Sequence, residues 1–137
     1  MSDCIFCKIV NKEIPATLVY EDETVLAFMD IGPIVKGHVL VIPKTHYDPV
    51  TETPDEIIAQ VHLVAKKIAQ AQMNALGADG VNIMQNNGAA AGQEVPHLHV
   101  HVIPRFNNDG HHWNWKPKSY ENFDEMTELA TQLQNQL

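Results

Sequence analysis

The chain has 137 residues, of which 45% are hydrophobic and 19% charged, and this composition is typical of one globular domain with a single core. Its formal net charge of −8 argues against binding to long nucleic acids, which requires a dense basic surface, but permits binding of a single nucleotide. No apolar run approaches the ~20 residues of a membrane helix, and the N-terminus lacks a signal-peptide pattern. We therefore expect one domain over residues 1–137, located in the cytoplasm and without a membrane partner.

Five segments have the apolar content and the boundaries of β-strands. An acidic turn at 21–23 separates the first two, Pro43 ends the strongly apolar third, and a loop rich in Gly, Ala and Asn separates the last two. The predicted strands are residues 17–20, 24–30, 38–43, 80–85 and 97–104. Five strands are within the usual range for one sheet.

Two helices are predicted. The first follows Thr53, which we expect to cap it together with Glu56, and it ends at Gly77, a residue type that commonly terminates helices. Its apolar residues recur at the three- and four-residue spacing of a buried stripe: Ile57, Val61, Val64 and Ile68, with Ile58, Ala65, Gln72 and Leu76 beside them. Residues 122–137 form the second. This order of elements predicts an α+β fold, an antiparallel sheet of about five strands with the helices on one face.

Histidine alternates with an aliphatic residue through the last predicted strand. Since successive side chains of a strand point to opposite faces, His97, His99 and His101 would share the face opposite the aliphatic residues. The outer two would lie ~13 Å apart, so the three cannot all bind one metal ion, and we expect their roles to differ. Three histidines in register, each able to titrate near neutral pH, indicate a functional site.

A Cys-x2-Cys pair, Cys4 and Cys7, stands near the N-terminus. In a reducing compartment this spacing indicates metal or redox chemistry more often than a structural disulfide, and a thioredoxin-type site would need a preceding strand. A zinc site would need two further ligands, which the histidine-rich segments could supply. Two inert, buried thiols are the alternative.

Two loops stand out beside the histidine-rich strand. The small residues of 88–94 leave room for a ligand to approach the backbone, and successive amides there could hold a phosphate; an ordinary connection between strands is the alternative. In the segment 111–115, Trp113 and Trp115 could cover a base, a partner subunit or a hydrophobic patch, or could pack within a C-terminal loop.

The stretch from His97 to Ile103 fits the defining pattern of the histidine-triad (HIT) family without a mismatch. Further similarity extends over residues 4–106, in the segments 4–9, 13–15, 27–31, 37–44 and 91–95. The chain most resembles the Hint branch of the family, in its bacterial, zinc-bearing form. The resemblance implies a homodimer of an α+β fold that hydrolyses nucleoside phosphoramidates and related nucleotidyl compounds.

The resemblance also implies roles for individual residues. His99 would be the nucleophile, His101 would contact the α-phosphate, and His38 would be a fourth histidine of the site. A structural zinc ion would be bound by Cys4, Cys7, His46 and His97. The purine and ribose would contact Phe6, Ile9, Ile14, Phe28, Asp30 and Ile31, and the phosphate side would be lined by Asn86, Gly92, Gln93 and Val95. Glu94 stands where some Hint proteins have a serine near the scissile bond, which leaves the contact to the leaving group open.

The implied reaction is attack of a neutral imidazole on phosphorus, giving a covalent nucleotidyl-histidine that water then hydrolyses. Hydrogen-bond donors from His101, if protonated, and from the backbone amides of 92–94 would stabilise the developing charge. The expected substrate is a purine nucleotide such as an AMP derivative. The alternatives are a dinucleoside polyphosphate hydrolase or nucleotidyl transferase with the same nucleophile, a nucleotide-binding regulatory module, and a zinc-handling protein without nucleotide affinity.

Overall fold

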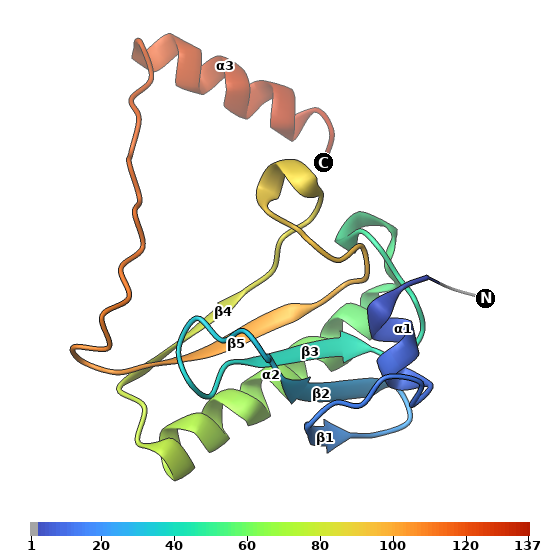
Figure 1. Cartoon of the computed structure of the whole chain (residues 1–137). Helices are drawn as coiled ribbons and strands as arrows, with labels where there is room; N and C mark the ends of the chain where they lie inside the picture. The colour runs from blue at the N-terminus through green and yellow to red at the C-terminus, as the bar shows by residue number, and fades with distance from the viewer. Residues whose placement is uncertain (1–2) are drawn as a thin grey trace.

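The chain folds as an α+β structure built on one antiparallel sheet, as the order of the predicted elements indicated (Figure 1). The computed structural model describes residues 3–137. The sheet has the order β1-β2-β3-β5-β4, with β1 (Leu18–Glu21), β2 (Val25–Met29), β3 (Val39–Pro43), β4 (Gly80–Met84) and β5 (Val100–Arg105). All neighbouring strands pair antiparallel, and β3 and β5 lie side by side in the interior of the sheet.

A long helix, α2 (Asp55–Leu76), covers one face of the sheet (Figure 1). Four residues of its predicted stripe, Val61, Val64, Ala65 and Ile68, are buried against aliphatic residues of β2, β3 and β5. Leu76, also predicted beside the stripe, is 52% exposed. The helix ends at Gly77, which has a left-handed φ of 69°, as predicted. The predicted cap is wrong, because Pro54 occupies the cap position and the Thr53 hydroxyl instead donates to the Pro49 carbonyl at 2.9 Å.

A second helix, α1 (Ile5–Val10), packs on the opposite face of the sheet and was not predicted. Residues of β2 and β3 alternate between two core clusters. Toward α2 lie Val25, Ala27, Val39 and Val41. Toward Phe6 of α1 lie Leu26, Phe28, Leu40 and Ile42. The expectation that the helices share one face is therefore wrong, and α1 was missed because six residues are too few to show a helical period.

The histidine-rich segment is a strand only in its second half. The strand β5 begins at Val100, so His97 and His99 precede it and the third histidine alone lies within it. The backbone before β5 pairs elsewhere, because the Leu98 amide donates to the Tyr47 carbonyl at 2.7 Å. The predicted burial of the aliphatic residues is nevertheless confirmed, since Leu98 and Val100 are both buried.

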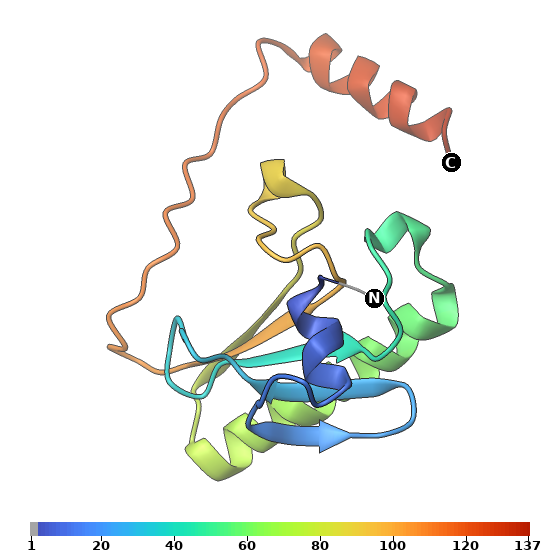
Figure 2. The ribbon, with the colours of Figure 1, turned by 45° about the vertical axis from the view of Figure 1, so that its right-hand side comes forward.

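After β5 the chain leaves the sheet as an extended arm that ends in α3 (Phe123–Gln134), and the two views show this helix away from the sheet (Figures 1 and 2). The Asn122 side chain caps α3 by accepting from the Glu125 amide at 2.8 Å. The apolar residues of the helix are exposed: Phe123, Met126, Leu129 and Leu133. Two short 3-10 turns, Val50–Glu52 and Ala89–Ala91, complete the elements of the described residues. Within residues 3–137, no helix has the length and apolar character needed to cross a membrane.

Candidate functional site

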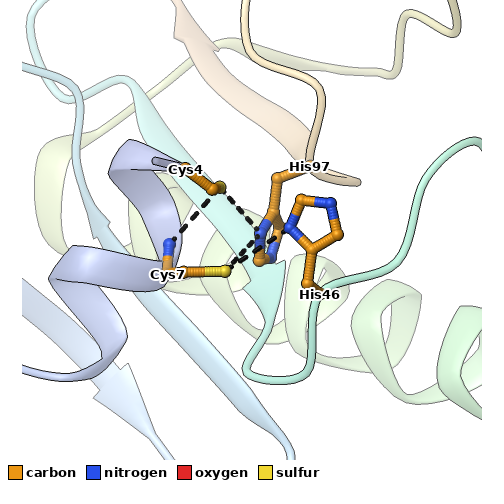
Figure 3. A group of neighbouring side chains, drawn as sticks. All are labelled: Cys4, Cys7, His46 and His97. Atoms are coloured by element: carbon orange, nitrogen blue, oxygen red, sulfur yellow. Dashed lines mark hydrogen bonds between the residues drawn. The ribbon is translucent and has the colours of Figure 1, made fainter. Parts of the chain in front are cut away.

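Four cysteine and histidine side chains that are far apart in sequence converge beside α1: Cys4, Cys7, His46 and His97 (Figure 3). Cys4 is the N-cap of α1, and its Sγ accepts from the Cys7 amide at 3.5 Å, so the helix start brings both thiols to one side. His97 Nδ1 lies 3.4 Å from Cys4 Sγ and 3.6 Å from Cys7 Sγ. His46 Nδ1 lies 3.4 Å from Cys7 Sγ. These are the four residues that the family resemblance assigns to zinc.

The four side chains fit a tetrahedral zinc ion. With Zn–S bonds of ~2.3 Å and Zn–N bonds of ~2.0–2.1 Å, the ligand atoms of a tetrahedron lie ~3.3–3.8 Å apart, and the separations given above fall in this range. Two thiolates and two imidazoles are a common donor set for structural zinc.

The His97 ring is already oriented as a metal ligand requires. Its Nε2 donates to the Pro43 carbonyl at 2.9 Å, which leaves Nδ1 unprotonated and facing the two thiols. Burial lowers the pKa of His97, which favours the neutral ring. A backbone carbonyl on the ring nitrogen away from the metal is the arrangement that fixes ligand orientation in zinc sites.

The remaining histidines of the site, His38, His99 and His101, form a second group. The ring centroids of His99 and His101 are 5.0 Å apart, and those of His38 and His101 are 5.1 Å apart. His99 Nδ1 donates to the His97 carbonyl at 2.7 Å, so that Nε2 of the neutral ring carries a lone pair. This is the tautomer that an attacking imidazole needs, and it is fixed by the backbone carbonyl and not by His38.

Hydrogen bonds also place the protons on His38 and His101. The Ile34 amide donates to His38 Nδ1 at 3.2 Å, so the proton of a neutral His38 is on Nε2. That Nε2 donates to His101 Nδ1 at 2.9 Å, which places the His101 proton on its own Nε2. The distance is shorter than the ~3.3 Å expected for two nitrogens on one tetrahedral ion. Although Asp30 lies within 4.8 Å of both rings, a hydrogen bond therefore describes the pair better than a metal site.

Both rings of this pair are neutral at pH 7. Burial is the main cause that lowers the pKa of His38, while the nearby Asp30 carboxylate opposes the shift. Burial, with the neighbouring His99 and His38 rings, lowers the pKa of His101 to about 4. The condition attached to the predicted role of His101, that its ring is protonated, is therefore not met in the protein alone. Its neutral ring still offers one N–H donor, on Nε2.

Apolar residues of α1 and β2 adjoin His99. The Phe6 ring lies edge-to-face with His99 at 5.1 Å and with Phe28 at 5.5 Å between centroids. Both phenylalanines are almost completely buried, with 6% and 3% of their surface exposed. The same cluster is bordered by two partly buried residues that were also assigned to the nucleotide, Ile9 and Val95.

The segment after β2 places its three assigned residues differently. Asp30 is half-buried, and its Oδ2 lies 3.6 Å from His38 Nε2. Its Oδ1 accepts from the Gly32 amide at 2.8 Å, and the turn that this bond closes leaves Ile31 fully exposed. The structure therefore does not bring Ile31 together with the buried phenylalanines. Ile14, from the loop after α1, is half-buried.

The loop at 88–93 is held by its own hydrogen bonds. The Gly92 amide donates to the Ala89 carbonyl at 3.0 Å, and the Gln93 amide donates to the Gly88 carbonyl at 3.2 Å. Gly88 and Gly92 both have positive φ, 87° and 93°, which the tight turn requires. The backbone amides of 92–94 were expected to face a phosphate, and for Gly92 and Gln93 this is wrong, because both of these amides donate within the turn.

Side chains connect this loop to the rest of the site. Gln93 Nε2 donates to Asp48 Oδ1 at 2.7 Å, and Gln93 Oε1 accepts from the Gly88 amide at 2.7 Å. Asn86 is half-buried, and a Cβ added at Gly92 would lie 3.7 Å from its Nδ2. The Glu94 side chain is exposed, so its carboxylate keeps contact with water.

A polar network at the end of β5 was not predicted. The Arg105 guanidinium donates to both carboxylate oxygens of Asp109, at 2.8 and 3.1 Å, and to Asn82 Oδ1 at 2.9 Å. Trp113 Nε1 donates to the same Asn82 oxygen at 3.1 Å. The Arg105 guanidinium holds the pKa of Asp109 far below its usual range. The network fixes the start of the C-terminal arm on β4. In the sequence, the only signal for it was the four-residue spacing of Arg105 and Asp109, which carry opposite charges. Trp115, in contrast to Trp113, is exposed.

Comparisons with known proteins agree with this arrangement. Residues 11–108 match the family model of the HIT domain. The chain is 55% identical over 107 residues to an uncharacterized HIT-like protein of Methanocaldococcus jannaschii, covering 78% of this chain and 82% of the relative. It is 40% identical over 131 residues to the adenosine 5′-monophosphoramidase HNT1 of Saccharomyces cerevisiae, covering 95% and 80%.

Solved structures have the same fold. A HIT family protein from Bacillus subtilis aligns with a TM-score of 0.91 and 42% identity, covering 99% of this chain and 98% of the other. A Zn-bound histidine triad family protein from Mycobacterium smegmatis aligns with a TM-score of 0.78 and 42% identity, covering 98% of each chain.

Proposed function

Since the chain belongs to the histidine-triad (HIT) family, we propose that it is a hydrolase of purine nucleoside phosphoramidates and related nucleotidyl compounds. The observation that carries the proposal is the pair of opposite tautomers at the site. His99 has a lone pair on Nε2, and His101, 5.0 Å away between ring centroids, has a proton on Nε2. A nucleophile and a hydrogen-bond donor are thus adjacent. The name of the yeast relative, an adenosine 5′-monophosphoramidase, supports the substrate class.

In the proposed reaction, the His99 Nε2 lone pair forms a bond to the α-phosphorus while the bond from phosphorus to the amine breaks. The amine leaves with the bonding electrons and takes a proton from solvent. Water then attacks phosphorus, its proton is released to solvent, and the bond to His99 breaks, giving the nucleoside monophosphate and the original imidazole. The His101 N–H donates to a phosphoryl oxygen and stabilises the charge that develops there. His38 holds His101 in the donating tautomer.

The nucleotide is proposed to lie on the α1 side of the sheet. The buried cluster around Phe6 adjoins the His99 ring, which supports a base position near it. The residues proposed to contact the purine are Phe6, Ile9, Ile14 and Phe28, together with Ile31 from the exposed turn after β2. Asp30 is proposed to bind the ribose hydroxyls, and the phosphate side is proposed to be lined by Asn86, Gly92, Gln93 and Val95.

We propose that one structural zinc ion is bound by Cys4, Cys7, His46 and His97. The ligand-atom separations and the orientation of the His97 ring support this, as does the Zn-bound relative from Mycobacterium smegmatis. With four protein ligands there is no coordination position for water, so the ion would stabilise the fold without taking part in the reaction. It would join α1 to the segment that leads into β5.

We propose that residues 1–137 act as one HIT domain, that the protein is a cytoplasmic homodimer, and that α3 takes part in the association. The exposed apolar stripe of α3 supports a dimer, because such a stripe has no cover from its own chain in the described structure. The edge strand β4, which pairs only with β5, supports it as well. A monomeric mass in sedimentation at micromolar concentration would contradict the proposal.

The function is tested by assaying the purified protein on two substrate classes, adenosine 5′-phosphoramidates and diadenosine polyphosphates. We expect release of AMP from the phosphoramidate with kcat/KM at least ~10-fold higher, which corresponds to ~1.4 kcal/mol in transition-state stabilisation. Faster cleavage of the polyphosphate would support the dinucleotide hydrolase instead. Tight AMP binding without turnover would support a regulatory module, and metal exchange without nucleotide affinity would support a zinc-handling protein.

A further inference from the structure

Gln72 of α2 contacts the backbone next to two histidines of the site. Its side-chain Nε2 donates to the Gly37 carbonyl at 3.0 Å and to the Val102 carbonyl at 2.9 Å. Gly37 immediately precedes His38, and Val102 immediately follows His101. One buried amide group, on the opposite side of the sheet from α1, therefore connects the two backbone segments that carry the hydrogen-bonded imidazoles.

Gln72 is itself held firmly. Only 3% of its surface is exposed, and its backbone carbonyl accepts from the Gly77 amide and, at 3.3 Å, from the Ala78 amide at the end of α2. The side-chain amide has one acceptable orientation, because exchanging its nitrogen and oxygen would point the oxygen at two carbonyl oxygens. Its Oε1 has no hydrogen-bond partner among the described residues, so the two donor contacts alone orient the group.

The backbone at Gly37 is also closely packed. Its φ is +103°, and a Cβ added there would lie 2.9 Å from Leu76 Cδ1 and 3.0 Å from Pro104 Cγ. The chain thus passes between the last residue of α2 and β5 with no space for a side chain. Packing on the α2 side of the sheet therefore restricts the backbone position of Gly37, the residue before His38.

The pairing of β3 with β5 does not reach His38. It ends at the pair of Val39 with Val102, and His38 lies one residue beyond it. The backbone of His38 is held on the β2 side, where its carbonyl accepts from the Asp30 amide at 3.0 Å, and by its amide, which donates to the Val35 carbonyl at 3.0 Å. The Gln72 amide spans both strands at this end of the ladder. It thereby links the segment of His38 to β5, the strand that carries His101, at the end where the β3–β5 pairing stops.

We propose that Gln72 is a positioning residue for the histidine pair. By holding the Gly37 and Val102 carbonyls, it maintains the bond from His38 Nε2 to His101 Nδ1 and so keeps the His101 proton on Nε2. Without this contact, His101 also samples the other neutral tautomer, whose Nε2 has no proton to donate. The kinetic consequence of this inference rests on the proposed function, whereas the tautomer itself does not.

The first test uses Gln72→Met, which keeps the length of the side chain and removes the donor. The matched control is Val61→Ala, a core truncation in the same helix, about 16 Å earlier along its axis and without a hydrogen bond to either carbonyl. Imidazole ¹⁵N spectra at neutral pH should show a protonated Nε2 and an unprotonated Nδ1 for His101 in the wild type and the control. Gln72→Met should show averaging between the two tautomers. An unchanged His101 spectrum in folded Gln72→Met would overturn the proposal.

The second test is kinetic. With an adenosine 5′-phosphoramidate, Gln72→Met should lower kcat by about 10-fold or more and change KM by less than about 2-fold, because misplacement of His101 weakens transition-state stabilisation. An equal loss of kcat in Val61→Ala would overturn the proposal by reducing it to core stability. If the wild type does not hydrolyse the substrate, the proposed function fails while the ¹⁵N result still decides the role of Gln72.

A measurement on the wild type covers the case in which Gln72→Met does not fold. Both Nε2 protons of Gln72 should exchange with solvent as slowly as the backbone amides of the neighbouring turn of α2, because both are held in buried hydrogen bonds. Fast exchange of these two protons, with the backbone amides still protected, would overturn the proposal.

Discussion

The two histidine groups of this protein lie next to each other and differ in which ring nitrogen the backbone engages. In the group with the cysteines, the Pro43 carbonyl takes Nε2 of His97 and leaves Nδ1 for a metal. In the second group, the His97 carbonyl takes Nδ1 of His99 and leaves Nε2 for a substrate. His97 and His99 are separated by one residue. A backbone acceptor therefore decides which ring nitrogen keeps its lone pair, and in His97 that nitrogen faces the two thiols.

The largest expected effect comes from removing the proposed nucleophile. His99→Ala should lower turnover of an adenosine 5′-phosphoramidate by about 10³-fold or more, because no other group can form the covalent intermediate. Zinc content, measured by elemental analysis, should stay at the wild-type value, since His99 belongs to the other group. His62→Ala, at an exposed histidine of α2, is the matched control and should be fully active. Hydrolysis by His99→Ala close to the wild-type rate would remove the distinction between the groups.

The converse variant, Cys7→Ala, should lose the metal and keep part of the activity. We expect a decrease in the free energy of unfolding of about 4 kcal/mol or more, the range in which loss of a metal site is a recognised cause. The decrease in kcat should be smaller, about 10- to 100-fold, since zinc would support His99 only through the position of its neighbour His97. Thermal unfolding with and without a chelator measures the effect on stability.

The control for this variant is Lys8→Ala in the same short helix. Its midpoint of unfolding should respond to the chelator as the wild type does. Wild-type protein prepared without chelators that contains no zinc would contradict the assignment of the four ligands.

The smallest effect concerns pH. Because the pKa of His101 falls from its ordinary 6.5 to about 4 on folding, the unfolded chain binds a proton in this window that the folded protein does not. The contribution of His101 to the free energy of unfolding is therefore complete above pH 6.5 and is lost as the pH falls toward 4. In urea unfolding between these values, the wild type should lose stability faster than His101→Gln, by up to ~1.4 kcal/mol per pH unit. Parallel curves would contradict the neutral state of the half-buried His101.

The sequence predicted the parts of the fold whose pattern is long or strongly apolar. The stripe of α2 and its end at Gly77 followed from helical spacing, and the third strand followed from its run of aliphatic residues. The irregular backbone before β5 could not be predicted, because the Leu98 amide pairs with Tyr47, which is distant in sequence. The predicted cap of α2 was wrong for a similar reason, since the Thr53 hydroxyl donates to the Pro49 carbonyl instead.

The residues of the site could be predicted from the sequence, whereas the hydrogen bonds between them could not. Motif and resemblance named the four zinc-type residues, and the structure brings all four together across 93 positions of the chain, the separation of Cys4 from His97. The tautomers of the histidines depend on which carbonyls and rings adjoin them, so no spacing rule could supply them. Gln72 was noted only as a residue beside a helix stripe, because its contacts connect three separate elements.

Locating the covalent intermediate shows directly whether His99, and not one of its neighbours, attacks phosphorus. Wild-type protein is denatured during turnover without acid, since phosphorus–nitrogen bonds are labile in acid, and the peptide that contains His97, His99 and His101 is fragmented in a mass spectrometer. We expect a nucleoside monophosphate adduct on His99 that is absent from His99→Ala. An adduct on His97 or His101, or hydrolysis that proceeds with no adduct on any of the three, would contradict the assignment of His99 as the nucleophile.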